Sequence, residues 1–259
     1  MKEIIFTLLG TGAADHLWER IGEADVRGSA GTLINRNILF DYGITGKENL
    51  SRAGIAPDEL DAIIFTHSHP DHFNPVALKE MLVQRKNPLP LAIYGSNELI
   101  GIMQDGINCQ LHPLKPGDKF TISGMDFTAL QANHLLYDPQ EFAFHYLIET
   151  ADGNVLYALD GAGFTKPEWL LIKDKALKLI IIDATMAESG NWRIFEHNDL
   201  EMIDHICKTL RKRGMIDDSS KVVLSHLART LWPPTQEEAE KLAGVYGFTV
   251  GYDGLEIRL

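Results

Sequence analysis

Three histidines and one aspartate occupy four of the six positions from His67 to His72, in the string Thr66-His67-Ser68-His69-Pro70-Asp71-His72. Neutral imidazole and carboxylate groups are the ligands that zinc, manganese and iron accept at hydrolytic centres. Folding alone does not require four ionisable side chains directly after an apolar run, so a polar surface loop is the weaker interpretation. The string predicts a metal site.

The spacing of the four side chains indicates two ions rather than one. His67 and His69 alternate along an extended segment, and Pro70 favours extended geometry at His69, so both imidazoles can point to one side. Asp71 and His72 follow after the chain turns. One tetrahedral ion cannot readily accept four such close neighbours, whereas two ions about 3.5 to 4 Å apart can, as in centres that hydrolyse phosphodiesters or esters.

Two ions need more ligands, and the rest of the chain offers them at strand ends. His134, Asp160 and His226 each come after a segment that reads as a buried strand. A lone histidine or aspartate in such a place is ordinarily a hydrogen-bonded polar group. The order and context of these three residues make them candidate ligands.

The elements that must position these side chains alternate between strands and helices. Asn74-Pro75 reads as an N-cap followed by proline at the first helical position, and 235–238 fits a capping box. The predicted strands are 3–9, two within 31–41 that are hinged at 35–37, 61–66, 90–94, 118–131, 142–149, 154–159, 178–183 and 220–225, and the main helices are 75–86, 199–213 and one from 235. This alternation indicates an α/β fold.

Composition narrows the class of protein. With 259 residues, 45% of them hydrophobic, we expect one domain over 1–259. The formal charge of −12 makes nucleic acid an unlikely partner and disfavours anionic membranes, and two distant cysteines suggest neither a disulfide framework nor a thiolate zinc site. The N-terminal run has no cleavage site and no stretch reaches membrane-spanning length. We expect a cytoplasmic protein with a small-molecule substrate, for which a homodimer is compatible with the sequence.

The ligand order resembles that of a known superfamily. The string H-x-H-x-D-H at 67–72, followed by isolated His134, Asp160 and His226, is similar to the metallo-β-lactamase-fold hydrolases, and 9–12 and 39–43 resemble the first-strand and third-strand signatures of that fold. The likeness spans nearly the whole chain. It is greatest for the phosphodiesterase branch, which contains the tRNA 3′-processing endonuclease and the cyclic phosphodiesterase of phosphonate breakdown. The resemblance implies a four-layer αββα sandwich.

The same resemblance implies a dinuclear hydrolase. The two ions would be zinc or manganese, with iron also acceptable, and a hydroxide that bridges them would attack a small phosphodiester, cyclic ones included. The implied ligands are His67, His69 and His134 for one ion, Asp71, His72 and His226 for the other, and Asp160 between them.

Asp71 and His197 are the candidate catalytic residues. His197 precedes the amphipathic helix 199–213 and resembles the histidine that this branch places beside the scissile phosphate, where it would protonate the leaving oxygen or donate a hydrogen bond to it. Helix capping and surface exposure are the competing interpretations of His197. Asp41 and Asp183 would either orient a ligand histidine or have a purely structural role.

Arg229 and His16 are candidate substrate contacts. A guanidinium can clamp a phosphate or carboxylate, and His16 lies in the irregular segment 13–30. Arg229 also departs from the family pattern, because the cyclic phosphodiesterases tend to have a histidine there, and 13–30 lacks their zinc-binding cysteines. No basic tRNA-binding arm is visible, which favours small substrates over RNA. Two alternatives stay open: a lactone or thioester hydrolase on the same centre, and a metal-binding sensor without turnover.

Overall fold

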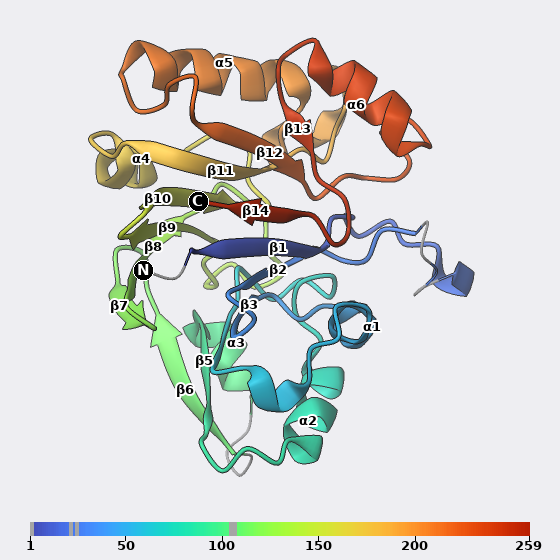
Figure 1. Cartoon of the computed structure of the whole chain (residues 1–259), viewed down its shortest axis with the longest axis vertical. Helices are drawn as coiled ribbons and strands as arrows, with labels where there is room; N and C mark the ends of the chain where they lie inside the picture. Colours follow the sequence, from blue (N-terminus) through green and yellow to red (C-terminus); the bar gives the residue numbers. More distant parts are fainter. Residues whose placement is uncertain (1–2, 21–22, 24–25, 104–107) are drawn as a thin grey trace. The chain divides into compact units, whose positions relative to one another are not determined.

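The computed structural model describes residues 3–20, 23, 26–103 and 108–259 (Figure 1). The chain divides into two compact units that are each assembled from discontinuous segments. The first unit comprises Met1–Lys115, Leu136–Phe142 and Tyr252–Arg258, and the second comprises Pro116–Leu135, Ala143–Gly251 and Leu259. Whether 1–259 behaves as one domain stays a prediction.

A seven-stranded sheet forms the centre of the first unit, in the order β14-β1-β2-β3-β4-β5-β6. Pairing is antiparallel from β14 to β3 and parallel from β3 to β6. The strands are β1 Ile5–Gly10, β2 Gly31–Ile34, β3 Ile38–Phe40, β4 Ala62–Ile64, β5 Leu91–Ser96, β6 Cys109–Leu114 and β14 Glu256–Arg258. The helices are η1 Trp18–Arg20, α1 Gly46–Arg52, η2 Pro57–Glu59, α2 Pro75–Gln84 and α3 Asn97–Ile102.

Helices α1, α2 and α3 cover a face of this sheet through a core of buried aliphatic side chains. Leu50 of α1, Leu78 of α2 and Leu99 of α3 pack in one cluster with strand residues such as Ile63. All three residues of β4 are buried, as is usual for a strand in the parallel part of a sheet. Asn74 caps α2, because its side chain accepts a hydrogen bond from the Ala77 backbone N–H at 3.1 Å.

The second unit repeats this arrangement with a second seven-stranded sheet, β13-β12-β11-β10-β9-β8-β7. Pairing is antiparallel from β7 to β10 and parallel from β10 to β13. The strands are β7 Lys119–Ile122, β8 Met125–Gln131, β9 Phe144–Thr150, β10 Gly153–Ala158, β11 Leu177–Asp183, β12 Lys221–Ser225 and β13 Thr249–Val250. The helices are α4 Lys166–Ile172, η3 Trp192–Phe195, α5 Leu200–Lys212 and α6 Gln236–Gly244.

Helices α4, α5 and α6 pack on this second sheet (Figure 1). Helix α5 buries Leu200, Ile203, Cys207 and Leu210 and leaves its other side exposed, as its amphipathic sequence predicts. Asp199 caps α5 through the Met202 N–H at 2.8 Å. The predicted capping box at α6 forms in part: the Thr235 hydroxyl accepts from the Glu238 N–H, and the Glu238 carboxylate accepts from that same hydroxyl rather than from the Thr235 N–H.

The sequence located most strands but merged one pair. The segment 118–131, predicted as strand throughout, is a β-hairpin that turns at Ser123 and Gly124, whose φ angles are 51° and 78°. Strands β6, β13 and β14 were not predicted, because they are short or only partly apolar. In the irregular segment 13–30, residues 21–22 and 24–25 lie outside the described residues. Within the described part of the chain, the helices are too short or too polar to cross a membrane.

Candidate functional site

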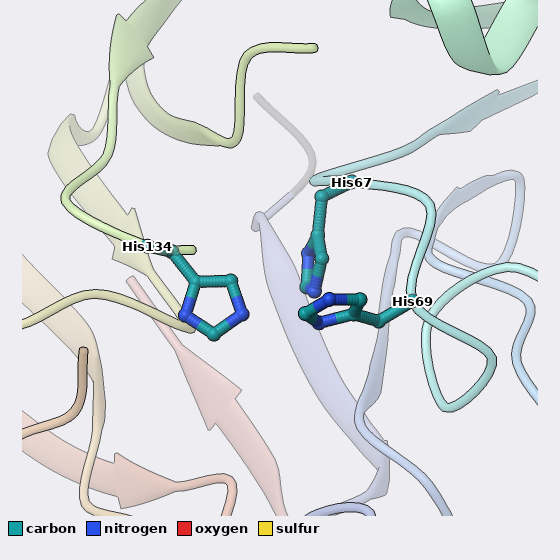
Figure 2. A group of neighbouring side chains, drawn as sticks. All are labelled: His67, His69 and His134. Carbon is teal, nitrogen blue, oxygen red and sulfur yellow. The ribbon is translucent and has the colours of Figure 1, made fainter. Parts of the chain in front are cut away.

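The loop after β4 carries the clustered candidate ligands of the first unit. His67 is buried and His69 is half-buried, and their ring centroids are 4.7 Å apart, so the predicted orientation of both imidazoles toward one side is correct. Figure 2 shows the two rings turned toward each other on this loop. The ring of His72 lies 4.3 Å from that of His67, and its Nε2 is 3.5 Å from the Asp71 carboxylate. All four predicted ligands of this unit are therefore neighbours.

Backbone contacts hold this loop against the segment that follows β3. The Tyr42 N–H donates to the His72 carbonyl at 2.8 Å, and the Asn74 N–H donates to the Tyr42 carbonyl at 2.9 Å. Gly43 is required at the contact, since a Cβ there would lie 1.8 Å from the Asp71 carbonyl oxygen. The third-strand signature thus has a packing reason: it lets two backbone segments approach closely beneath the ligand loop.

Asp41 orients the loop from within this unit. Its buried carboxylate lies 2.8 Å from His72 Nδ1 and accepts from the Thr66 N–H at 2.8 Å and from the Thr66 hydroxyl at 2.9 Å. Burial raises the pKa of Asp41, although His72 beside it acts in the opposite direction. Of the two interpretations of Asp41, orientation of a ligand histidine is the one that these contacts support.

A second buried carboxylate, Glu141, supports the loop from another segment of the first unit. It accepts hydrogen bonds from the hydroxyls of Ser68, at 2.5 Å, and Ser96, at 3.1 Å. Burial raises the pKa of Glu141, and the two hydroxyl groups offset part of that effect. Ser68 lies between the two histidines of the string, so this network fixes the middle of the ligand loop.

The candidate residues of the second unit lie at the carboxyl ends of three adjacent parallel strands. Asp160 follows β10, Asp183 is the last residue of β11, and His226 follows β12. With His197 they form a buried group in which one possible ligand atom of each lies within 4.8 Å of the others. Side chains at the carboxyl ends of neighbouring parallel strands meet at one edge of a sheet, which is why residues so far apart in sequence converge.

Three of these oriented residues have left-handed backbone conformations. Asp41, Asp160 and His226 have φ angles of 60°, 57° and 59°, and each follows the end of a strand closely. Non-glycine residues with positive φ are uncommon, with Asp, Asn and His the most tolerant, and such residues concentrate at functional sites. The conformation turns each side chain out of the strand direction at the edge of its sheet.

His197 is held by Asp183 and Thr185. Its Nδ1 lies 2.6 Å from the Asp183 carboxylate and 3.0 Å from the Thr185 hydroxyl, which is also 2.8 Å from His226 Nδ1. Burial acts to lower the pKa of His197, but the negative charges of Asp183 and Asp160 outweigh it and raise that pKa to about 9. Burial likewise acts to raise the pKa of Asp183, yet the facing imidazole lowers it overall. His197 is therefore a buried, oriented imidazole and not an exposed helix cap.

His134 lies beside His197 in the same unit. Their ring centroids are 5.1 Å apart, and His134 Nδ1 is 3.3 Å from the Glu196 carbonyl oxygen. His134 extends from the loop after β8 (Figure 2). The second unit thus brings together all three of its predicted ligands and the predicted acid.

The donor set fits divalent metal ions. Four of the five predicted ligand histidines have Nδ1 near an oxygen of the chain, which leaves Nε2 for an ion. Histidines that bind metal in proteins almost always have such a partner on the other ring nitrogen. In addition, Asp160 and Asp183 are buried close together, an arrangement that a cation stabilises. The Nδ1 partners are the Thr66 hydroxyl for His67, Asp41 for His72, the Glu196 carbonyl for His134 and the Thr185 hydroxyl for His226.

The remaining candidates differ in their placement. Arg229 is exposed on the loop after His226, and His16 is half-buried in the first unit. Trp232, three residues after Arg229, is buried and donates its indole N–H to the Ala184 carbonyl at 2.6 Å. His145 is a buried structural residue, with Nδ1 2.6 Å from the Glu168 carboxylate.

Sequence reasoning missed Thr66, Thr185 and Asn198. The Thr66 hydroxyl contacts both the Asp41 carboxylate and His67 Nδ1. The Thr185 hydroxyl contacts Nδ1 of both His197 and His226. Asn198 donates to the Gly161 carbonyl at 2.8 Å and accepts from the Gly163 N–H at 2.8 Å, so it ties the start of α5 to the turn after Asp160. The one signal for these residues in the sequence is that each is a polar residue within a few positions of a candidate site residue. That pattern is too common to identify a functional residue.

Comparison with known proteins places the chain in a family. The model of the β-lactamase superfamily domain matches residues 36–227. The exodeoxyribonuclease WalJ of Streptococcus pneumoniae serotype 2 is 24% identical over 212 residues, covering 75% of this chain and 74% of WalJ.

Solved structures agree in fold. The metallo-β-lactamase fold protein YhfI from Bacillus subtilis superposes with a TM-score of 0.78 at 16% identity, over 100% of both chains. A diphosphatase from the PhnP family gives 0.75 at 16% identity, over 100% of this chain and 98% of the other. The short form of human tRNase Z gives 0.70 at 18% identity, over 98% of both. The expected α/β fold of the metallo-β-lactamase type is confirmed. The chain therefore belongs to the β-lactamase superfamily domain family and is, as its ligand string predicted, a hydrolase of that superfamily.

Proposed function

We propose that this protein is a dinuclear metal-dependent phosphodiesterase that acts on a small phosphodiester. The two groups of donors would join in one centre, and the metal would be zinc or manganese, with iron as the third candidate. One ion would be held by His67, His69 and His134, the other by Asp71, His72 and His226, and both by Asp160.

The observation that carries the proposal is the shared organisation of the two donor groups. In each unit, buried carboxylates and hydroxyls fix the Nδ1 side of ligand imidazoles, as Asp41 does for His72 and Thr185 does for His226. Such preorganised imidazoles are typical of metal centres and are unnecessary for folding. Two structural neighbours are named as a diphosphatase of the PhnP family and as human tRNase Z, and these names support a phosphate-directed reaction.

Bound divalent ions would activate water as a nucleophile and offset negative charge on the phosphate. The chain would supply the remaining functions. His197, buried and raised in pKa to about 9, carries a proton at neutral pH and would give it to the leaving oxygen. Asp183 would hold the imidazole in the orientation that this transfer needs. Asp71, whose carboxylate lies 3.5 Å from His72 Nε2, would hold the same ion as His72.

The central test joins metal content with a substrate panel. We expect purified protein to hold about two transition-metal equivalents, to hydrolyse bis-p-nitrophenyl phosphate, and to lose and regain activity when metal is chelated and restored. Opening of lactones or thioesters without phosphodiester hydrolysis would establish the alternative hydrolase. A fully metallated protein that is inactive on all three classes would favour the sensor.

His197 gives a second test. His197→Ala should lower kcat by about 10²- to 10⁴-fold with the metal content unchanged, the range expected for loss of a general acid. The dependence on the leaving group identifies the role: the loss should be large for an alkoxide and small for p-nitrophenolate, which needs little protonation. An equal loss for both leaving groups would assign His197 to a structural role instead.

The relation to WalJ favours one further candidate function, removal of nucleotides from a DNA end. The charge of −12 opposes binding of a long polyanion, so we rank it second. A 5′- or 3′-labelled single-stranded oligonucleotide distinguishes the two. If the oligonucleotide is shortened stepwise, and faster than a dinucleotide is hydrolysed, the exonuclease is supported. If the dinucleotide is hydrolysed faster than the oligonucleotide, the small-substrate enzyme is supported.

A further inference from the structure

We propose that the exposed aromatic face of η3, formed by Trp192 and Phe195, binds a nucleobase of the substrate beside His197. The proposal rests on the proposed phosphodiesterase function and narrows its substrate to a nucleotide phosphodiester. It commits to a base, a flat aromatic ring, as the occupant of this face.

The geometry of η3 places the two aromatic side chains together. In a 3₁₀ helix, residues three apart lie above one another on the same face. Trp192 and Phe195 have this spacing, and they are 66% and 77% exposed. Single exposed apolar residues are ordinary on protein surfaces, whereas two large exposed rings three residues apart on one short helix offer an extended aromatic surface, which we call the platform.

Hydrogen bonds tie this platform to the proposed acid. The Arg193 carbonyl accepts from the backbone N–H groups of both Glu196 and His197, each at 2.9 Å. The Glu196 carbonyl in turn lies 3.3 Å from His134 Nδ1. Leu135, the next residue after His134, is 67% exposed. Exposed apolar side chains thus lie within two residues of His197 and of His134 along the two segments that carry these imidazoles.

The chemistry of the platform matches a nucleotide. The Arg193 guanidinium lies 5.0 Å from the centre of the Trp192 ring, so a cation accompanies the aromatic surface. Aromatic side chains with adjacent arginine are the usual means of binding unpaired bases, because every base has a π-face and every nucleotide a phosphate. The charge of −12 disfavours long strands and therefore limits the occupant to one or two nucleotides.

A pair of substrates with one leaving group tests this inference. Thymidine 5′-(p-nitrophenyl phosphate) and methyl p-nitrophenyl phosphate differ in the base-bearing group, and the shared nitrophenyl ring cancels in their ratio. In Trp192→Ala/Phe195→Ala, we expect kcat/KM for the thymidine compound to fall about tenfold or more, mainly through KM, and the value for the methyl compound to change less than about twofold. Equal changes for both compounds, or none, would overturn the proposal.

The matched control is Leu170→Ala/Val245→Ala, which removes two exposed apolar side chains from α4 and from the end of α6; these residues are 54% and 82% exposed. It should leave the ratio of the two substrates unchanged. Gel filtration of the η3 variant at several concentrations provides another outcome. Suppose that the wild type is a dimer, that the variant is a monomer, and that the variant leaves the substrate ratio unaltered. The face would then be a contact between copies of this chain, and the proposal would be wrong.

Binding separates this inference from the proposed function. If neither substrate is hydrolysed, the phosphodiesterase proposal fails, and the affinity of the metal-loaded protein for 2-aminopurine deoxyribonucleoside monophosphate still tests the platform by fluorescence. Weaker binding to Trp192→Ala/Phe195→Ala than to the wild type and the control would sustain a base-binding face. Equal binding to all three would reject it.

Discussion

The two units organise their candidate ligands in opposite ways along the sequence and in the same way in space. In the first unit, His67, His69, Asp71 and His72 lie on one loop. In the second, His134, Asp160 and His226 follow three different strands. Yet in both units a buried aspartate and a threonine hydroxyl orient imidazoles: Asp41 and Thr66 in the first, Asp183 and Thr185 in the second. A short motif is therefore one way to gather candidate ligands, and the pairing of distant strands is the other.

The units differ in what supports the donors. The first uses Glu141, a buried carboxylate that accepts from two serine hydroxyls. The second uses the buried pair of His145 and Glu168. The His145 ring packs directly against Gly161, the residue after Asp160, where a Cβ would lie only 2.5 Å from His145 Nε2. Hydroxyl donors to a carboxylate thus support a loop in one unit, and an imidazole–carboxylate pair supports a strand end in the other.

The largest effect is expected when a ligand is removed from either unit. His69→Ala and His226→Ala should each lower bound metal and reduce phosphodiesterase activity by more than about a thousandfold, since both nucleophile activation and charge neutralisation depend on the ions. Metal analysis and steady-state kinetics measure this, with the exposed His205→Ala as control. If one variant keeps full metal and activity, its unit does not contribute to the centre.

Next in size is the cost of breaking the buried pair in the second unit. His145→Leu should destabilise the fold by about 3 to 5 kcal/mol, because it leaves the buried Glu168 carboxylate without its imidazole partner. His145→Leu/Glu168→Leu should recover most of this loss. In the first unit, Glu141→Gln should cost about 1 kcal/mol, the scale of an ordinary hydrogen bond. Urea denaturation compares the three, and equal losses at His145 and Glu141 would contradict the distinction.

The contribution of His145 also depends on pH. Burial acts to lower its pKa, but Glu168 and the nearby aspartates raise it above the ordinary value of about 6.5. A group whose pKa is higher in the folded state stabilises the fold fully at pH values below its unfolded-state pKa. This contribution is lost as the pH rises through the folded-state pKa. The stability difference between wild type and His145→Leu should therefore be greatest below about pH 6.5 and shrink in alkaline solution.

Smaller effects should separate the two orienting aspartates. Asp41→Asn should weaken metal affinity by about 10- to 100-fold, because Asp41 holds a ligand histidine. Asp183→Asn should lower kcat over a similar range with a smaller change in metal affinity, because its contact is with His197. Metal titration and kinetics on the same preparations distinguish these patterns. Identical profiles for both variants would mean that the two aspartates have one role.

The smallest effect concerns the hairpin turns of the two sheets. Asn35 and Arg36 have φ angles of 49° and 69° between β2 and β3, where Asn-Gly is the favoured pair. Arg36→Gly should stabilise the chain by up to about 1 kcal/mol, since relief of left-handed strain exceeds the entropy cost of glycine. Ser123→Asn makes the corresponding change before Gly124 in the second unit. Thermal unfolding measures both, and destabilisation by either variant would show that side-chain contacts outweigh turn geometry.

The sequence by itself determined the ligand loop and most of the elements around it. His67 to His72 are adjacent, so their types alone predict metal chemistry, and Asn74-Pro75 and the apolar face of α5 predict helices from local rules. Asp160 and His226 became candidate ligands through their places after predicted strands and through the order of residues in a resembling family. The convergence of their two strand ends depends on strand pairing and register, which no local pattern contains.

Only the tertiary structure decided the roles of the supporting residues. From the sequence, Asp41 and Asp183 could each either orient a histidine or have a structural role, and their distances to His72 and His197 show that they orient imidazoles. Thr185 and Asn198 were invisible because a polar residue near a strand or helix end is common. Local spacing specifies side-chain chemistry, whereas burial and the pairing of distant strands specify which groups face each other, and these arise only when the whole sheet is assembled.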